Sequence, residues 1–157
     1  MRVIVCESAD AAADQVAAAI LNALEAKPTS VLGLATGSTP IGVYTRLVRA
    51  HREGRADFSS VRTFNLDEYL GLPAEHPQSY RTFMRHHLLD DLDIPGDRAC
   101  FPPTEGAQLR ARCAQYEDAI RAAGGIDIQL LGIGRNGHIG FNEPTSSLAS
   151  RTRSTAW

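Results

Sequence analysis

The sequence lacks the long apolar runs, the paired cysteines and the excess of charge that mark several large classes of protein. No stretch of it approaches the roughly 20 consecutive apolar residues that a membrane-spanning helix needs, and the apolar start RVIVC ends at Glu7, too early for a signal peptide. Its three cysteines lie far apart without a C-x-x-C pair, which argues against a disulfide framework and fits a reducing compartment. A net charge of -2 gives no reason to expect binding to nucleic acid or to an anionic membrane. We therefore expect a cytoplasmic globular protein.

What the chain does contain is an alternation of short apolar runs and amphipathic helical segments. Buried strands are predicted at residues 2–6, 31–35, 61–66 and 126–131, and helices at about 8–26, 41–52, 107–122 and from Ser79 onward. This alternation favours the α/β class, with an open, mainly parallel sheet and helices on both faces (Rossmann-like, doubly wound). Four strands are fewer than the about five or six usual for such sheets. No finishing strand follows Pro144, so we interpret residues 1–157 as the N-terminal part of a single α/β domain.

Three of the predicted strands end in loops with residues suited to chemistry, and the carboxyl ends of parallel strands are where such sheets bind ligands. The first loop is Thr36-Gly37-Ser38-Thr39, followed by Pro40 in the first turn of a helix. N–H groups at the start of a helix bind phosphate, and Ser38 and Thr39 add hydroxyls. The alternative is an ordinary strand-to-helix turn with a Ser or Thr cap.

The second loop carries two adjacent carboxylates, Asp67 and Glu68, directly after a strand. A partly buried carboxylate at this place is suited to act as a general base. Acidic residues also populate solvated turns, which is the simpler interpretation of the pair alone. The neighbouring Tyr69 and Leu70 indicate that this turn packs against other parts of the chain.

The third loop, within LLGIGRNGHIGFNEP at residues 130–144, has the G-x-G-x-x-G spacing of a dinucleotide-binding fingerprint. That fingerprint leads into a helix and is followed, about 20 residues later, by an acidic residue that binds the ribose. Here Gly140 and Pro144 argue against an immediate helix, and no such acid follows. The pattern therefore does not predict a nicotinamide cofactor.

The same loop carries Asn136, His138 and Glu143, a histidine between two side chains able to orient it. A histidine so placed transfers protons near neutral pH, whereas the alternative is a histidine packed within a turn. A metal site is not predicted: His86 and His87 project about 100° apart on a helix, so one ion does not easily bind both.

Three segments of the chain resemble the glucosamine-6-phosphate deaminases, sugar-phosphate enzymes related to the 6-phosphogluconolactonases. They are LGLATGSTPIGVY, TFNLDEYLGLPAEHPQSY and LLGIGRNGHIGFNEPTSSLASRTR, in the order found in that family and spread over residues 31–153. The lactonases typically have Asp-Glu-Arg after the third strand and a Ser-rich run after Gly-His. Asp67-Glu68-Tyr69 and FNEP at residues 141–144 therefore favour the deaminase branch.

The resemblance implies a role for each candidate residue. Asp67 matches the general base that moves a proton between C2 and C1 of the opened sugar, and His138 the residue that assists opening of the pyranose ring. Glu143 matches the acid paired with that histidine, Asn136 a residue that orients it, and residues 36–39 a segment that binds the substrate phosphate. The implied reaction converts glucosamine 6-phosphate and water to fructose 6-phosphate and ammonia in amino-sugar catabolism, without a metal or organic cofactor.

The resemblance also sets limits. Family members continue well beyond residue 157 and supply further basic residues from that part, which leaves the folding and activity of this chain alone in question. Ser147 and Arg153 match the site where N-acetylglucosamine 6-phosphate activates some members, but Thr155 replaces a lysine of the activated ones, so we expect no allosteric activation. Homo-oligomerisation stays open. Two alternatives remain: a related sugar-phosphate lactonase or isomerase, and a truncated, non-catalytic sugar-phosphate-binding domain.

Overall fold

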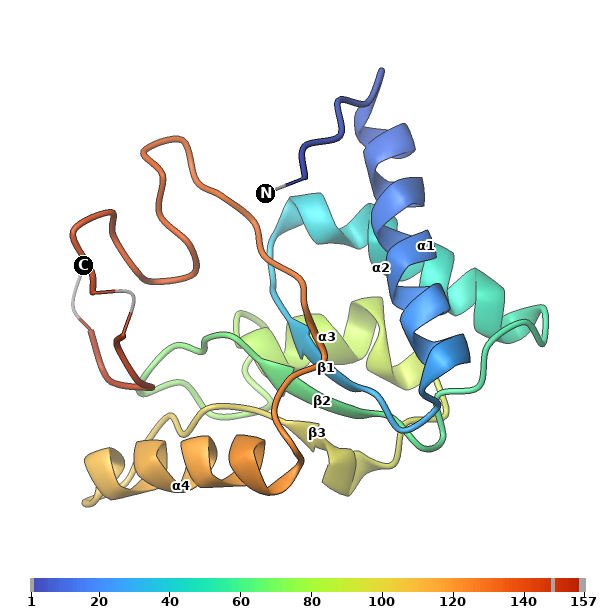
Figure 1. Cartoon of the computed structure of the whole chain (residues 1–157). Coiled ribbons are helices and arrows are strands. Elements are labelled where there is room, and N and C mark those ends of the chain that lie inside the picture. Colours follow the sequence, from blue (N-terminus) through green and yellow to red (C-terminus); the bar gives the residue numbers. More distant parts are fainter. Residues whose placement is uncertain (1, 148, 156–157) are drawn as a thin grey trace.

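A four-stranded parallel sheet forms the centre of the computed structural model, which describes residues 2–147 and 149–155 (Figure 1). Its strands are β1 (Val31–Leu34), β2 (Arg62–Asn65), β3 (Ala99–Cys100) and β4 (Ile128–Gln129), in the spatial order β3-β2-β1-β4. The chain adds β2 and β3 on one side of β1 and then returns to add β4 on the other. The order of strand addition thus reverses between β1 and β4, and open α/β sheets bind ligands beyond the carboxyl ends of the strands at such a reversal.

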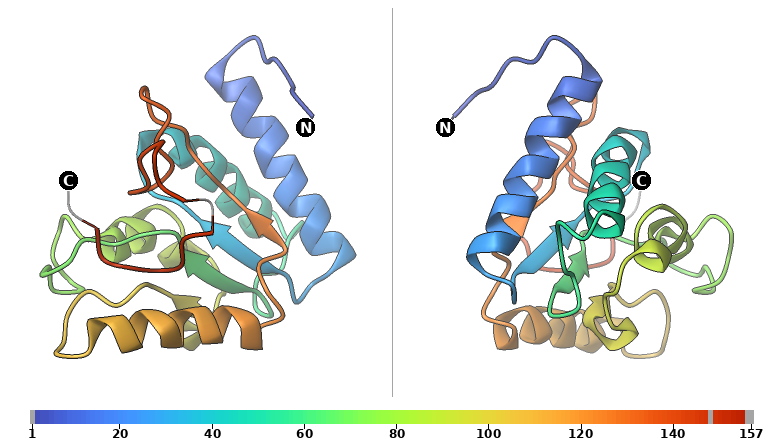
Figure 2. Two further views of the ribbon diagram at one scale, coloured as in Figure 1. Left: turned by 60° about the vertical axis from the view of Figure 1, so that its left-hand side comes forward. Right: turned by 90° about the vertical axis from the view of Figure 1, so that its right-hand side faces the viewer.

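Helices cover both faces of the sheet, as predicted for the doubly wound class (Figure 2). Helices α1 (Ala9–Ala26), α2 (Ser38–Arg52) and α3 (Tyr80–His87) pack on the face that carries Leu32 and Leu34, whereas α4 (Leu109–Ala122) packs on the face that carries Val31 and Phe64. Successive strand residues point to opposite faces, so both apolar sets of β1 are buried. Two short 3-10 helices, Leu89–Asp91 and Gly96–Arg98, join α3 to β3. Among the described residues, no helix combines the length and the apolar content required to cross a bilayer.

The sequence prediction was wrong about two strands. Residues 2–6 lie outside the sheet, and Val3 and Val5 are 71% and 92% exposed. An apolar run becomes a strand only where an edge is available for pairing, and β4, the nearest edge, forms a ladder of only two residues. The segment around Ala99–Cys100, where no strand was predicted, instead forms β3 against β2. Helix α2 also begins earlier than predicted, at Ser38 rather than at about residue 41.

Two buried tyrosines fix the strand ends that precede the site loops. The hydroxyl of Tyr44, on α2, donates a hydrogen bond to the carbonyl of Ala35 at the end of β1. The hydroxyl of Tyr116, on α4, donates to the carbonyl of Asn65 at the end of β2, at 2.8 Å. Ala35 follows the last residue of β1 and Asn65 is the last residue of β2. Both residues are buried, so each tyrosine supplies a donor to a carbonyl that water does not reach.

Replacement of Tyr44 by Phe should therefore lower the free energy of unfolding by about 1–3 kcal/mol, because the buried Ala35 carbonyl loses its donor. Urea unfolding followed by circular dichroism measures this change. Tyr69→Phe is the matched control, since the Tyr69 side chain is exposed at the surface and loss of its hydroxyl should cost much less. Equal losses in the two variants would contradict the role assigned to the Tyr44 hydroxyl.

Candidate active site

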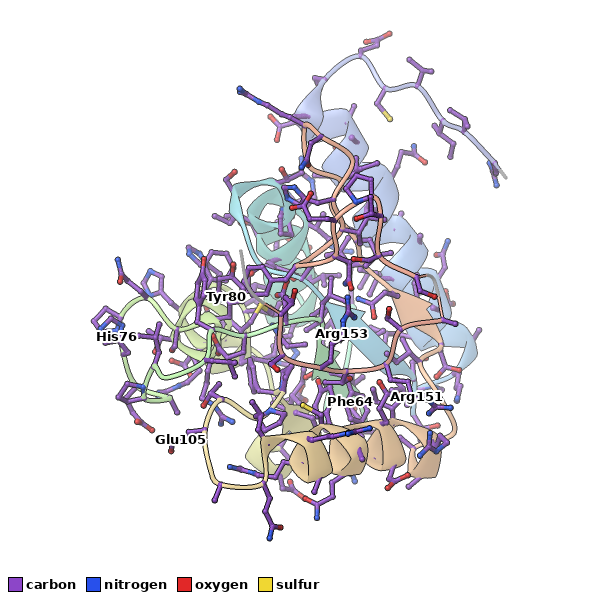
Figure 3. The ribbon with its side chains drawn as sticks, turned by 90° about the vertical axis from the view of Figure 1, so that its left-hand side faces the viewer. Phe64, His76, Tyr80, Glu105, Arg151 and Arg153 are labelled. Atoms are coloured by element: carbon purple, nitrogen blue, oxygen red, sulfur yellow. The ribbon has the colours of Figure 1, made fainter. Side chains whose placement is uncertain are left out.

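A cleft of about 460 Å³ opens at the carboxyl edge of the sheet. Its lining includes Asn65, Asp67, Tyr116 and Gln129, together with the tail segment 150–155. Figure 3 shows Arg151 and Arg153 above α4, and both residues line the same cleft as Phe64. The buried Nδ2 atom of Asn65 has no hydrogen-bond partner among the described residues. The cleft therefore combines a carboxylate, a buried amide and two guanidinium groups beside the sheet.

Asp67 follows β2 and is largely removed from water at this edge. Burial raises the pKa of its carboxyl from the ordinary 3.8 to about 6, and the negative charge of the neighbouring Glu68 adds to the shift. A carboxylate with a pKa near 6 is ionised at neutral pH and is a stronger base than an exposed aspartate. Asp67 thus has the protonation behaviour expected of a general base.

Asn136 lies between the other two predicted catalytic residues. Its Nδ2 donates a hydrogen bond to Oε2 of Glu143 at 2.8 Å, and its Oδ1 lies 2.7 Å from Nδ1 of His138. A carboxylate only accepts hydrogen bonds, so the contact with Glu143 fixes which end of the amide is Nδ2. The Oδ1 atom must then accept from Nδ1–H of His138, which selects the tautomer whose unprotonated nitrogen is Nε2. The arrangement prepares His138 to accept a proton at Nε2.

The glycines of this loop allow close approach of side chains from the loop itself and from the loop after β2. A Cβ atom at Gly134 would lie 2.2 Å from the ring of His138, so the ring rests directly on the glycine backbone. Gly137 has a φ of +90°, which other residues rarely adopt. At Gly140, with φ +58°, an added Cβ would lie 2.9 Å from Oδ2 of Asp67. Gly140 therefore brings the loop after β4 against the carboxylate that follows β2.

The first predicted loop forms an open helix start. Gly37 precedes α2 with a φ of +113°, and no side chain among the described residues caps the helix. Ser38 and Thr39 are exposed, and Pro40 occupies the first turn as predicted. The Ser or Thr cap considered as the alternative does not form. The first N–H groups of an α-helix point out of its N-terminal end, which is where helices bind anions. Binding of phosphate here stays a prediction.

An aromatic cluster joins the site loops, and only its first member was indicated by the sequence. The rings of Tyr69, Tyr80 and Phe141 have centroids 4.8 to 5.9 Å apart, and the two tyrosine hydroxyls lie 3.3 Å apart. Burial raises the pKa of Tyr80, with further contributions from the Tyr69 hydrogen bond and the negative charge of Asp67, while a hydrogen bond with Thr36 opposes the shift. Tyr80 thus interacts with residues of both the first and the second loop.

Comparison with known proteins identifies the family of the chain. The family model described as glucosamine-6-phosphate isomerases/6-phosphogluconolactonase matches residues 6–154. The chain belongs to this family. Glucosamine-6-phosphate deaminase of Cellvibrio japonicus is 56% identical to it over 153 residues, which are 98% of this chain and 58% of that protein. Glucosamine-6-phosphate deaminase 2 of Bacillus subtilis is 50% identical and is matched over 61% of its length.

Solved structures of the isomerase/lactonase family have the same fold. A monomeric glucosamine-6-phosphate deaminase superimposes with a TM-score of 0.92 at 42% identity, over 96% of this chain and 63% of that one. The 6-phosphogluconolactonase of Thermotoga maritima reaches a TM-score of 0.72 at 25% identity, over 89% of this chain and 62% of that one. The chain thus spans less than two thirds of the length of these relatives. The resemblance found from the three sequence segments is confirmed at the level of the family.

Ser147 and Arg153, matched by sequence to an activator site, are both among the described residues. Ser147 Oγ accepts a hydrogen bond from the amide of Ala149, and Arg153 Nη2 lies 3.5 Å from Ser146 Oγ. Their regulatory role remains a prediction. Across residues 2–147 and 149–155, no group of three or more His, Cys, Asp and Glu side chains is placed to hold a metal ion. The rings of His86 and His87 contact each other, with centroids 4.9 Å apart.

Replacement of Asn136 by Ala should change the tautomer of His138. Without the Oδ1 acceptor, Nδ1–H loses its partner, and the neutral imidazole should shift towards the Nε2–H form that free histidine prefers. Two-dimensional ¹⁵N–¹H NMR of the imidazole nitrogens, recorded where the ring is neutral, distinguishes the two forms. Asn142→Ala is the control, because the Asn142 amide donates to the Ile139 carbonyl in the same loop. An unchanged His138 spectrum in Asn136→Ala would show that Asn136 does not select the tautomer.

Proposed function

We propose that this chain carries the catalytic edge of a glucosamine-6-phosphate deaminase, which converts glucosamine 6-phosphate and water to fructose 6-phosphate and ammonia. The observation that carries the proposal is the half-buried Asp67, whose carboxyl has a pKa of about 6 and faces the glycine loop that holds the oriented His138. One base and one oriented imidazole are the groups that an aldose–ketose isomerisation requires.

The proposed reaction begins with opening of the sugar ring. His138 accepts the proton of the C1 hydroxyl at Nε2 and returns a proton to the ring oxygen, which leaves an open chain with an aldehyde at C1. Asn136 and Glu143 hold the imidazole during both transfers. A fixed tautomer favours this exchange because the accepting nitrogen needs no prior rearrangement.

Asp67 then moves a proton from C2 to C1. Removal of the C2 proton gives an enol-like intermediate with the amine still on C2, and return of the proton to C1 gives an imine at C2. Addition of water to this imine and loss of ammonia leave the ketone of fructose 6-phosphate. The sequence of steps involves no net oxidation, so it needs no nicotinamide.

The uncapped start of α2 is the proposed site of the substrate phosphate. Residues 36–39 supply backbone N–H groups and hydroxyls at the positive end of the helix, where a doubly charged anion is stabilised. Tyr80 interacts with Thr36 in this loop and with Asp67 in the next. The phosphate and the reacting carbons would therefore be held by connected loops.

Incubation with glucosamine 6-phosphate tests the proposal directly. Equal amounts of ammonia and fructose 6-phosphate are the expected products. Hydrolysis of 6-phosphogluconolactone without release of ammonia would instead favour the related lactonase activity. Saturable binding of glucosamine 6-phosphate, seen by NMR without turnover, would favour a non-catalytic sugar-phosphate-binding domain.

Replacement of Asp67 by Asn should lower kcat by about 10²- to 10⁴-fold with little change in substrate binding, because only the base is lost. The same variant should be more stable at pH 7, by on the order of 2 kcal/mol. In the folded protein Asp67 keeps its proton up to about pH 6, but in the unfolded chain it loses it near 3.8. Stability of the wild type therefore falls as the pH rises through this window, whereas asparagine does not titrate.

Urea unfolding at pH 3.5 and pH 7 measures the difference in the free energy of unfolding between Asp67→Asn and the wild type. This difference should disappear at pH 3.5. Asp118→Asn is the control, because Asp118 is exposed and its ion pair with Arg121 lies at the surface, where loss costs at most about 1 kcal/mol. Full turnover in Asp67→Asn would exclude Asp67 as the base. If Asp67→Asn were no more stable than the wild type at pH 7, burial would not destabilise the ionised carboxylate of Asp67.

A further inference from the structure

Both carboxylate oxygens of Glu68, the neighbour of Asp67, accept hydrogen bonds from backbone amides. Oε1 accepts hydrogen bonds from the amides of Tyr80, at 2.8 Å, and Tyr69, at 2.9 Å, while Oε2 accepts one from the amide of Arg81 at 2.8 Å. Tyr80 and Arg81 are the first two residues of α3. We propose that Glu68 is a positioning residue that holds the carboxylate of Asp67 in the site by binding the first turn of α3, an inference that rests on the proposed role of Asp67 as the base.

Glu68 completes the cap of α3. Ser79 Oγ accepts from the amide of Thr82, and Phe83 donates the first backbone hydrogen bond of the helix, to the Ser79 carbonyl. The amides of Tyr80 and Arg81 have no acceptor within the helix, and Glu68 supplies it from 12 and 13 residues away. Hydrogen bonds to a carboxylate are stronger than neutral ones, and the positive end of the helix adds to them. The link between the loop and α3 is therefore a strong one.

This link fixes the backbone of Asp67 from one side, and the sheet fixes it from the other. The amide of Leu66 donates to the carbonyl of Leu34 at 2.9 Å, which continues the pairing of β2 with β1. Asp67 lies between this contact and the Glu68 carboxylate, so its backbone is held at both neighbours. Its side chain then meets Gly140 across the site, where little space remains for adjustment. A shift of the loop would remove the carboxylate from that position.

The Tyr69–Tyr80–Phe141 cluster supports the same arrangement. Tyr69 follows Glu68, Tyr80 begins α3, and Phe141 follows Gly140 in the opposite loop. Detachment of Glu68 from α3 would separate the first ring from the second. The loop after β2 would then loosen from both α3 and the loop after β4.

Several charged or titratable groups influence Asp67, and Glu68 is the one that belongs to the same turn. Burial is the larger cause of the raised pKa of Asp67, and the negative charge of Glu68 adds to it. Tyr80 from α3 and Tyr116 from α4 interact electrostatically with the carboxylate, and Arg151 and Arg153 of the tail line the same cleft. Because Glu68 contributes both the charge and the anchor, its removal should change the titration of Asp67.

The test compares Glu68→Gln and Glu68→Ala with Glu75→Gln, which removes an exposed carboxylate from the same loop. The pKa of Asp67 is measured in the 157-residue chain by ¹³C NMR of side-chain carboxyls, assigned with Asp67→Asn, and the exchange rates of the Tyr80 and Arg81 amides are recorded. This titration requires no turnover.

Glu68→Gln keeps one acceptor oxygen but loses the charge, so the pKa of Asp67 should fall by about one unit while the Tyr80 amide stays protected. Glu68→Ala loses every acceptor, so both amides should exchange faster and the Asp67 pKa should fall further towards 3.8 as water reaches the carboxyl. Glu75→Gln should leave the Asp67 titration near pH 6. If the chain is active, the acid limb of the pH profile of kcat should shift in each variant as the pKa of Asp67 does, while KM changes little.

Faster amide exchange in Glu68→Ala with the Asp67 pKa unchanged would show that Glu68 only caps α3, and the inference would be wrong. Glu68→Gln also loses Oε2, the acceptor of the Arg81 amide. Faster exchange of that amide in a folded Glu68→Gln variant, with the Asp67 titration unchanged, would overturn the inference independently of any unfolding in Glu68→Ala. Failure of the proposed function gives a different result, because the wild-type chain would then release no ammonia whatever the position of the Asp67 titration.

Discussion

The parallel pairing of β1 with β2 on one side and β4 on the other is the constraint on which the site depends. Gly33 pairs with Phe64 in β2 and with Gln129 in β4. Because the strands are parallel, the loops that follow them emerge at one edge, although they are about 30 and 65 residues apart along the chain. A Cβ at Gly33 would lie 1.9 Å from the Gln129 side chain, so the glycine allows that side chain to lie across the sheet. Backbone hydrogen bonding therefore brings residues 36–39, Asp67 and the loop that carries His138 to one edge of the sheet.

Burial of a carboxylate at this edge opposes stability, and the surrounding contacts explain how the fold tolerates it. Asp67 loses solvation and meets a second negative charge, and both effects disfavour its ionised form. The adjacent Glu68 carboxylate is satisfied by three amide groups, so its own burial is compensated. The same turn thus contains one carboxylate whose hydrogen bonds hold the structure and one whose desolvation makes it a stronger base. The two acids are adjacent in sequence but have different environments.

The sequence predicts those elements whose formation depends on local pattern and composition. Alternating apolar runs identify β1 and β2, and Ser79 identifies the start of α3, because burial and capping are encoded within a few residues. It does not predict β3, since Ala99–Cys100 becomes a strand only by pairing with β2. It also predicts a strand at residues 2–6, where the structure has none. Apolar side chains favour a strand, but a strand also needs the edge of another strand to pair with. The contact of Glu68 with α3 joins residues far apart in sequence, and its geometry follows only from the tertiary fold.

The G-x-G-x-x-G spacing at residues 132–137 shows why a pattern must be interpreted through the contacts of each position. In a dinucleotide site the glycines admit a pyrophosphate at the start of a helix. Here Gly134 admits the imidazole of His138, and Gly137 supplies a positive φ, whereas a Cβ at Gly132 would meet no described atom within 4 Å. Gly140, outside the pattern, makes the approach to Asp67. The side chains of His138 and Asp67 come close to the backbone at Gly134 and Gly140, so the same glycine spacing here accommodates side chains of the protein itself.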